Sequence, residues 1–243
     1  MTGDLLLPLP IEAVLFDFHG TLFDAHSPGQ WIAAAHRLVA TGGGPDLRPG
    51  ADLTGLARHL DDVWTHARKI DPSSERDRDP VRHREVFRRA VMLRSEVDET
   101  FADALYAVMA DQWQPFDDTV AVLNALRENG IRTLLLSNIG RDVRPRLRAC
   151  GVAGLLDDVV LSYEVGLIKP DPQIFALAVE RLGVPAERAL MVGDSPLDDT
   201  GGTPLGLRTL ILPRIPGRVR GLTAVLRLVL GPAPASRPPA EQR

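Results

Sequence analysis

The sequence has little cysteine, little lysine and no long apolar run. Cys150 is the only cysteine among 243 residues, so no disulfide can form within the chain. Arginine, aspartate or proline interrupts every apolar stretch before it reaches the roughly 18 to 20 residues that a membrane-spanning helix needs. The opening MTGDLLLPLP has no basic segment followed by a long apolar one, so we expect no secretory signal. These absences favour a cytoplasmic protein without membrane contact.

An excess of positive charge is also missing. The formal net charge is −4, from 28 basic and 32 acidic residues, so no overall basic field attracts nucleic acid, and we expect no nucleic-acid partner. The basic residues are nearly all arginine, and the two lysines are Lys69 and Lys169. Because arginine does not replace lysine where a compact point charge is required, the position of each lysine in the fold is informative.

The apolar residues that are present fall into short runs typical of buried strands. The chain is 44% hydrophobic and 25% charged, as in an ordinary globular protein. From residue 116 onward these runs alternate with helical patterns of about ten residues, which predicts a doubly wound, Rossmann-like parallel sheet in an α/β fold. Asp171 and Pro172 predict the start of one such helix, which ends at Gly183. The predicted strands are 11–16, 133–136, 159–161, 189–192 and 209–212.

The stretch between the first strand and the second has a different pattern. Four amphipathic helical patterns, near residues 31–39, 53–67, 86–91 and 101–109, occur there without a convincing strand. They predict an all-helical cap domain inserted into the α/β core. We therefore expect an α/β core of residues 1–25 and 115–230 and a helical cap of 26–114. A disordered tail with four prolines follows at 231–243.

Four polar segments follow predicted strands or lie in loops near them. In a doubly wound sheet, the carboxyl ends of the strands meet at a single crevice. Carboxylates there can act as a nucleophile and can hold Mg²⁺, while a serine hydroxyl and a lysine ammonium can stabilise a transferred phosphoryl group. The set therefore suits phosphoryl transfer. The segments are DFHGTL at 17–22, SN at 137–138, KPDP at 169–172 and GDSPLDD at 193–199.

Together and in this order, the four motifs resemble those of the haloacid dehalogenase superfamily, whose members are mostly phosphatases. The resemblance covers roughly residues 11–230. It implies that Asp17 is the nucleophile and forms an aspartyl phosphate. It also implies that Ser137 and Lys169 bind the phosphate, with Asn138 beside them.

The same resemblance implies a magnesium site. Its ligands would be Asp194, a carboxylate oxygen of Asp17 and the backbone carbonyl of His19. Asp199 is similar to the second acid of the family's metal loop, and the neighbouring Asp198 can share that role. The expected activity is Mg²⁺-dependent hydrolysis of a phosphate monoester on a small phosphorylated metabolite, by a monomer or a homodimer.

The sequence departs from the family pattern at His19. Phosphatases of this family usually carry a second aspartate there, which serves as general acid and base. An imidazole with a reference pKa near 6.5 can move the same protons at neutral pH, although nearby Mg²⁺ disfavours its protonated form. Three interpretations stay open: His19 is the acid and base, the enzyme is slow or specialised, or the protein binds phosphate ligands without useful turnover.

Two other branches of the family lack the second aspartate as well. Dehalogenases typically have an aromatic residue there, but their metal-free members lack the Gly-Asp-Ser pattern that this chain has at 193–195, so Asp194 favours phosphate chemistry. Phosphonoacetaldehyde hydrolases use a cap lysine as a Schiff base. Lys69 is the only lysine of the expected cap, and a solvated charge at a helix end is its simpler interpretation.

Substrate specificity would lie in the expected cap, because the cap closes over the leaving group in members that have one. Its polar or aromatic candidates are more simply explained as structural residues than as substrate contacts. They are Trp31, His66, Arg68, Arg82 and His83.

Overall fold

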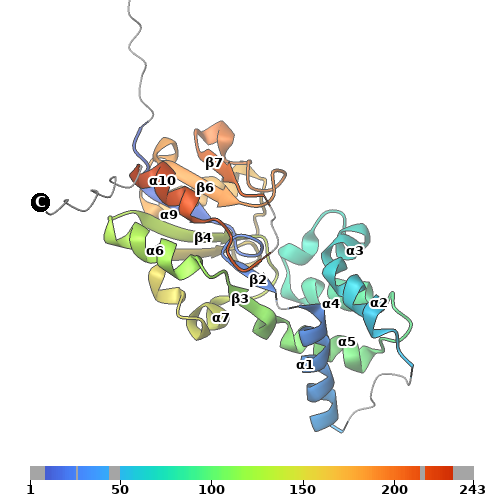
Figure 1. Cartoon of the computed structure of the whole chain (residues 1–243). Coiled ribbons are helices and arrows are strands. Elements are labelled where there is room, and N and C mark those ends of the chain that lie inside the picture. Colours follow the sequence, from blue (N-terminus) through green and yellow to red (C-terminus); the bar gives the residue numbers. More distant parts are fainter. Residues whose placement is uncertain (1–8, 26, 44–49, 214–216, 232–243) are drawn as a thin grey trace, which may run out of the picture.

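A five-stranded parallel sheet forms the centre of the protein. The computed structural model describes residues 9–25, 27–43, 50–213 and 217–231. The strand order is β5-β4-β1-β6-β7, so the chain winds outward from β1 in both directions (Figure 1). This confirms the predicted doubly wound α/β fold, with each strand within two residues of its expected bounds. The strands are β1 (Ala13–Phe16), β4 (Arg132–Ser137), β5 (Asp158–Leu161), β6 (Ala189–Gly193) and β7 (Arg208–Ile211).

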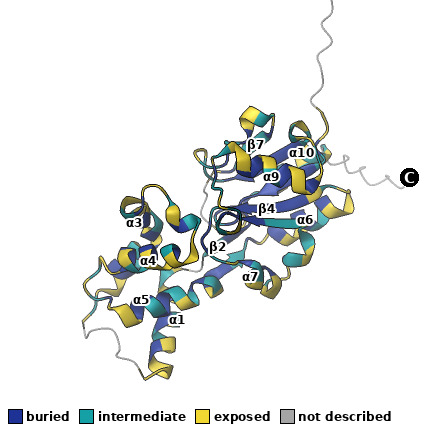
Figure 2. Cartoon of the chain, turned by 180° about the vertical axis from the view of Figure 1, so that it is seen from behind, coloured by how far each residue is buried: buried dark blue, intermediate teal, exposed yellow. Residues whose placement is uncertain are grey.

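Helices cover both faces of the sheet because the strand side chains alternate between two apolar clusters. Val14 and Phe16 of β1 pack in one cluster with the helices α6 (Thr119–Glu128), α7 (Arg144–Ala149) and α10 (Thr223–Leu230). Ala13 and Leu15 pack in the other with α9 (Pro172–Leu182). All four residues are fully buried, and the strands are accordingly dark in Figure 2. The predicted limits of α9 are confirmed, since Asp171 caps its first turn and Gly183 ends it with φ +62°.

Five of the helices between β1 and β4, all within residues 28–108, gather to one side of the sheet in Figure 1. The prediction of four helices was wrong for 53–67, which forms two helices that meet at Asp62. Asp61 and Asp62 lie at the carboxyl end of the first, where negative charge opposes the helix dipole. The apolar face continues across the break, because Leu60 and Val63 are both buried. The helices are α1 (Pro28–Thr41), α2 (Leu53–Asp61), α3 (Val63–Ile70), α4 (Pro80–Val91) and α5 (Glu99–Val108).

A short antiparallel ribbon, absent from the sequence prediction, connects these helices to the sheet. It consists of β2 (Phe23–Ala25) and β3 (Trp113–Pro115). Trp113 and Gln114, expected inside an all-helical segment, are therefore strand residues. Three-residue strands are too short to produce a recognisable alternation of apolar and polar residues. The expected cap border at 114 lies in this ribbon, and the border at 26 lies outside the described residues.

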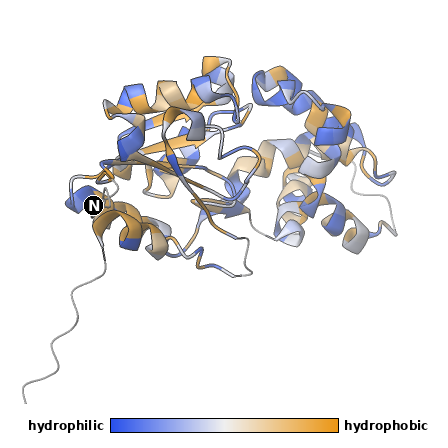
Figure 3. Ribbon diagram, turned by 90° about the horizontal axis from the view of Figure 1, so that it is seen from above, coloured by the Kyte–Doolittle hydropathy of each residue, from blue (hydrophilic) through white to orange (hydrophobic). Residues whose placement is uncertain are grey.

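The hydrophobic core runs without interruption from the sheet into the five helices. The Phe18 ring lies 4.8 Å from Phe23 and 5.2 Å from Trp113, centroid to centroid, and joins one face of the sheet to the ribbon. Figure 3 shows both apolar and polar residues along most helices, as amphipathic packing requires. Within the described residues, none of the helices combines the length and the apolar character that crossing a bilayer demands.

The remaining helical elements are short, and the expected tail is mostly undescribed. The stretch between β6 and β7 contains a short 3₁₀ turn. Residues 232–243, most of the expected disordered tail, lie outside the described residues. The short elements are α8 (Ser162–Val165) and the 3₁₀ turns Glu75–Asp77, Met109–Gln112, Ala153–Leu155, Ala186–Arg188 and Thr203–Leu205.

Candidate active site

Asp17 lies at the carboxyl end of the central strand, where a tight turn holds it. Its backbone N–H donates to the carbonyl of Val192 at 2.9 Å and so extends the pairing of β1 with β6. In the turn that follows, the Phe18 carbonyl accepts from the amides of Leu22 and Phe23 at 3.1 and 2.9 Å. Gly20 adopts φ +82°, a conformation that side chains disfavour. The DFHGTL motif therefore forms one hydrogen-bonded turn, termed here the nucleophile turn (residues 17–22).

Lys169 is buried between two carboxylates. Its Nζ donates to Asp17 Oδ1 at 2.7 Å and to Asp199 Oδ1 at 2.6 Å, and the residue is 3% exposed. Asn138 holds the backbone of this lysine from both sides: the Asn138 amide donates to the Lys169 carbonyl at 2.8 Å and accepts from the Lys169 N–H at 2.7 Å. These bonds give Asn138 the role of orienting Lys169, and its predicted contact with phosphate stays a prediction.

Three carboxylates from two segments far apart in the sequence, the nucleophile turn and the loop after β6, converge here. One oxygen each of Asp17, Asp194 and Asp199 lies within 4.8 Å of the others. Asp199 is fully buried and also accepts from the Ser195 N–H at 2.9 Å. A side chain at Gly193 would place its Cβ 1.9 Å from Asp199 Oδ2, which explains why glycine precedes Asp194. We refer to these three acids as the carboxylate cluster.

Asp198, the alternative second acid, lies outside the carboxylate cluster. Its carboxylate accepts from the Ser195 hydroxyl at 2.9 Å and closes the loop that follows β6. Of the two neighbouring acids that the sequence left open, Asp199 is thus the one that the fold brings to Asp17 and Asp194.

Burial and charge shift the ionisation of this centre. Burial raises the pKa of the Asp17 carboxyl to about 6; Lys169 acts against this shift and the other two acids of the cluster add to it. Burial alone would lower the pKa of Lys169, but the charges of Asp17 and Asp199 raise it above its usual value, so the ammonium stays protonated. One lysine cannot neutralise three carboxylates. This surplus of oxygen donors fits a hard divalent cation such as Mg²⁺.

The other predicted site residues lie at the same edge of the sheet. Ser137 ends β4 and is 3% exposed. His19 is half-buried in the nucleophile turn, and its backbone pairs with that of Phe23 in an isolated β-bridge. Lys69, by contrast, is exposed on α3. Trp31 belongs to the core of the helices, because its ring stacks on Phe87 and its indole N–H donates to the Leu105 carbonyl at 2.9 Å.

A loop after β4 joins this edge of the sheet to the helices, and sequence reasoning missed its contacts. A Cβ on Gly140 would lie 2.1 Å from the Arg76 carbonyl and 2.5 Å from His83 Cβ, so only glycine permits this approach. The Ser162 hydroxyl accepts from the Ile139 N–H at 2.8 Å and donates to the Asp77 carbonyl at 2.5 Å. Ser162 directly follows the predicted strand 159–161, the same positional signal that identified the four motifs.

Charged and aromatic side chains complete this contact. The Arg141 guanidinium lies 4.9 Å from the centre of the Tyr106 ring, and the Tyr106 hydroxyl is 2.9 Å from His83 Nδ1. Burial raises the pKa of Asp77 to about 6; Arg76 opposes this, and the negative charges of Asp71 and Asp198 add to it. The influence of Asp198 indicates that the turn carrying Asp77 faces the loop after β6.

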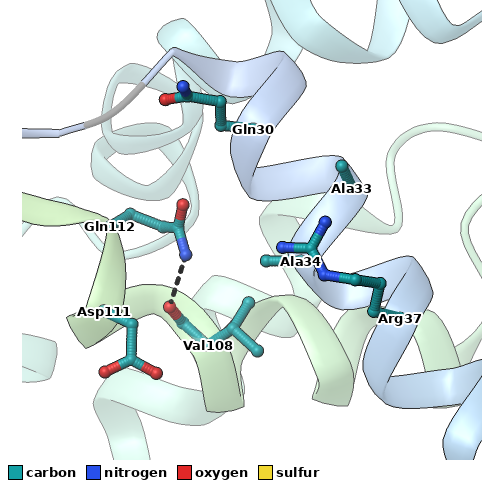
Figure 4. Close-up of a pocket in the computed structure, with 7 residues that line it drawn as sticks. All are labelled: Gln30, Ala33, Ala34, Arg37, Val108, Asp111 and Gln112. Carbon is teal, nitrogen blue, oxygen red and sulfur yellow. Dashed lines mark hydrogen bonds between the residues drawn. The ribbon is translucent and has the colours of Figure 1, made fainter.

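A separate hollow of about 550 Å³ lies on the helices (Figure 4). Its lining comes from α1 and from the segment before β3, where the Gln112 amide donates to the Val108 carbonyl at 3.1 Å. The lining includes no member of the carboxylate cluster. It consists of Gln30, Ala33, Ala34, Arg37, Val108, Asp111 and Gln112.

The fold and the site together define a class: a parallel α/β protein with helices inserted after the first strand, whose acids meet at the strand ends. Residues 11–206 match the family described as haloacid dehalogenase-like hydrolase. The chain belongs to this family of hydrolases.

Relatives within the family differ in the reaction that their names state. The chain is 25% identical over 219 residues to (S)-2-haloacid dehalogenase 1 of Pseudomonas sp. (strain CBS-3), covering 85% of this chain and 86% of that protein. It is 34% identical over 139 residues to phosphoserine phosphatase of Thermus thermophilus, covering 56% of this chain and 55% of that protein. The chain thus spans about half the length of relatives at this higher identity.

Solved structures share the fold. A phosphatase of this superfamily from Thermococcus onnurineus aligns over 91% of this chain and 99% of its own, with a TM-score of 0.60 and 23% identity. This likeness concerns the arrangement of the elements.

Proposed function

We propose that the protein hydrolyses phosphate monoesters of small metabolites with the help of Mg²⁺, through a phosphoaspartate at Asp17. The carboxylate cluster carries this proposal. A nucleophile and a lysine suffice to displace a halide from carbon, whereas Asp194 and Asp199 bring two further acids within reach of Asp17, a surplus of oxygen donors that suits a divalent cation. A divalent cation would assist phosphate ester hydrolysis in particular, because it can neutralise the negative charge on the phosphate oxygens of the substrate.

The residues present would hold Mg²⁺ through Asp17 and Asp194, with Asp199 in support and the His19 carbonyl as a backbone donor. Bound there, Mg²⁺ would supply Lewis-acid stabilisation of negative charge on phosphate oxygens. Lys169, which donates to Asp17, would add a second positive charge at the same carboxylate.

In the first step of the proposed reaction, an Asp17 carboxylate oxygen attacks phosphorus and the bond from phosphorus to the leaving alcohol breaks. His19 donates the proton that the alkoxide takes up. In the second step, His19 accepts a proton from water as the water oxygen attacks phosphorus, and the bond from phosphorus to the Asp17 oxygen breaks. Phosphate leaves and the carboxylate is restored.

The helices between β2 and β3 would act as the cap domain and select the substrate. The contacts of Gly140 with His83 and of Ser162 with the Asp77 carbonyl support this, because they bring the helices against the site edge of the sheet. A roofed site favours a small phosphorylated metabolite. We place the protein in the cytoplasm, as a monomer or homodimer without nucleic-acid or membrane partners.

Carbon–halogen hydrolysis is the second candidate, and the relatives named as 2-haloacid dehalogenases favour it. In that reaction Asp17 would displace halide from carbon and form an ester. The departing halide is weakly basic, so the reaction needs neither a proton from His19 nor a divalent cation.

A two-substrate assay separates the candidates. Wild type, Asp17→Asn and Asp194→Ala are assayed on a panel of phosphate monoesters and on 2-chloropropionate, with Mg²⁺ or with EDTA. We expect phosphate release that requires Mg²⁺ and is lost in both variants. Chloride release that persists in EDTA and in Asp194→Ala would establish the dehalogenase instead. Absence of both products in wild type would favour a protein that only binds phosphate ligands.

A further inference from the structure

A buried arginine from the end of the chain reaches the nucleophile turn. Arg220 is 3% exposed, and its Nε donates to the carbonyl of Gly20, a residue 200 positions earlier in the sequence. Gly20 lies three residues after Asp17 and next to His19. A hydrogen bond to a backbone carbonyl restricts rotation of that peptide plane. The bond from Arg220 therefore restrains the turn that carries the side chains of Asp17 and His19.

The same guanidinium reaches the end of strand β7. Its Nη2 donates to the Leu212 carbonyl at 2.8 Å, and its Nη1 donates to the Pro213 carbonyl. The Leu212 N–H in turn donates to the Gly193 carbonyl at 2.8 Å, directly before Asp194. Arg220 therefore connects the turn bearing Asp17 with the neighbour of the strand that leads to Asp194.

Asp118 holds the backbone around Arg220 in place. One of its carboxylate oxygens accepts from the Arg220 N–H at 3.0 Å, and the other accepts from the N–H groups of Gly221 and Leu222 at 2.8 and 2.7 Å. The same region is joined to the end of the nucleophile turn, because the Thr119 hydroxyl donates to the Leu22 carbonyl at 2.8 Å. The arginine is thus fixed at its backbone as well as at its guanidinium.

We propose that Arg220 is a positioning residue that fixes the nucleophile turn relative to the strand ends bearing the carboxylate cluster. Its planar guanidinium offers donors in several directions at once, whereas a lysine has a single nitrogen. Arg220 acts through the Gly20 carbonyl and takes no part in bond making or breaking. Only the kinetic part of the test below depends on the proposed phosphatase function.

The test compares Arg220→Met and Arg220→Lys with Arg218→Met in the full-length protein. Arg218 is a matched control, because it lies on the same segment, is exposed, and donates to the Pro115 carbonyl at 2.9 Å. Amide hydrogen exchange is followed by mass spectrometry in peptides spanning residues 17–23, and in peptides from α9 as an internal reference.

We expect exchange in 17–23 to accelerate at least tenfold in both Arg220 variants, with α9 unchanged and Arg218→Met like wild type. With p-nitrophenyl phosphate and Mg²⁺, kcat should fall at least tenfold while KM changes less than threefold. Unchanged exchange in 17–23 would overturn the proposal, and so would equal acceleration in α9 or failure of both Arg220 variants to fold. If wild type proves inactive on phosphate esters, the proposed function fails, and the exchange result still decides the role of Arg220.

Discussion

Of the two lysines in the chain, the fold buries Lys169 and leaves Lys69 exposed. The buried ammonium lies within 2.7 Å of carboxylate oxygens on Asp17 and Asp199. Without it, two acids would remain side by side in a buried site, where like charges repel strongly. The role of Lys169 is therefore to neutralise Asp17 and Asp199 with one compact ammonium group. An arginine does not replace it there, because its guanidinium is larger and planar.

Lys169→Met should lower turnover of phosphate esters by about 10²–10³-fold, because it removes a preorganised charge from the reacting centre. Steady-state kinetics with p-nitrophenyl phosphate measure this, and Lys69→Met is the matched control that should retain wild-type rates. Loss of activity in Lys69→Met with little change in Lys169→Met would contradict the assignment. Such a result would favour a Schiff-base mechanism on the exposed lysine.

His19 decides how protons move in the proposed reaction. General acid catalysis is typically worth about 10²–10⁴ in rate. His19→Ala should therefore slow hydrolysis of alkyl phosphates by that order and slow p-nitrophenyl phosphate much less, because its leaving group needs little protonation. His19→Asp should retain or raise activity and abolish any rate-limiting ionisation near neutral pH. If His19→Ala slows both substrate types equally, or neither, His19 is not the general acid and its role is structural.

At the scale of elements, the loop after β4 and helix α4 meet at Gly140. A Cβ there must push apart the Arg76 carbonyl and His83, and overpacking of this kind typically costs about 1–3 kcal/mol. Gly140→Ala should lower the free energy of unfolding by that amount and accelerate hydrogen exchange in residues 75–90. Gly154→Ala is the control, because a Cβ there meets nothing within 4 Å. Equal stability of the two variants would show that the loop and α4 separate without cost.

The same contact predicts a dependence of stability on pH. Burial, followed by the charges of Arg141 and Arg76, lowers the pKa of His83 from 6.5 to about 3. The unfolded chain therefore binds a proton below about pH 6.5 that the folded chain excludes, so stability falls as the solution becomes more acidic. From pH 7 to pH 5 this group alone should remove about 2 kcal/mol from the free energy of unfolding.

Urea unfolding at pH 5, 7 and 8 tests this prediction by comparing wild type with His83→Asn. The variant should lose less stability than wild type between pH 7 and pH 5, by about 2 kcal/mol. Both proteins should be unaffected by this group between pH 7 and pH 8, which provides the internal control. An identical loss in both proteins on acidification would mean that His83 is protonated in the folded state.

At the scale of the whole molecule, cation binding should be coupled to folding. The carboxylate cluster exists only when two distant segments, residues 17–22 and 193–199, are folded together, so the proposed Mg²⁺ should bind the folded chain alone. At 100 times its dissociation constant a ligand stabilises by about 2.7 kcal/mol, which corresponds to about 5–10 °C in Tm for a chain of this size.

Mg²⁺ should accordingly raise the Tm measured by circular dichroism, and EDTA should reverse the effect. Asp194→Ala should abolish the rise and increase the Tm of the metal-free protein, because it relieves repulsion within the cluster. Asp198→Asn, which changes an acid outside the cluster, should respond to Mg²⁺ like wild type. A rise that survives in Asp194→Ala would place the cation elsewhere.

The sequence by itself determined the order of the elements and the chemistry at the strand ends. Buried parallel strands read as continuous apolar runs, and their carboxyl ends must share one edge. Asp17, Ser137 and Asp194 could therefore be placed together from the sequence alone, whereas Lys169 was assigned to the site through the family resemblance of its motif. Local signals also sufficed for α9, whose cap and terminal glycine depend on neighbours in the chain.

Only the tertiary structure decided the contacts between distant segments. It brought Asp199 rather than Asp198 to Asp17 and Asp194, turned Asn138 toward the Lys169 backbone and brought Arg220 to the Gly20 carbonyl. None of these has a local pattern, because each depends on the direction of a side chain or on the approach of a backbone far along the chain. The physical reason is range: periodicity and capping act over a few residues, whereas a hydrogen bond across 200 positions exists only once the chain has packed.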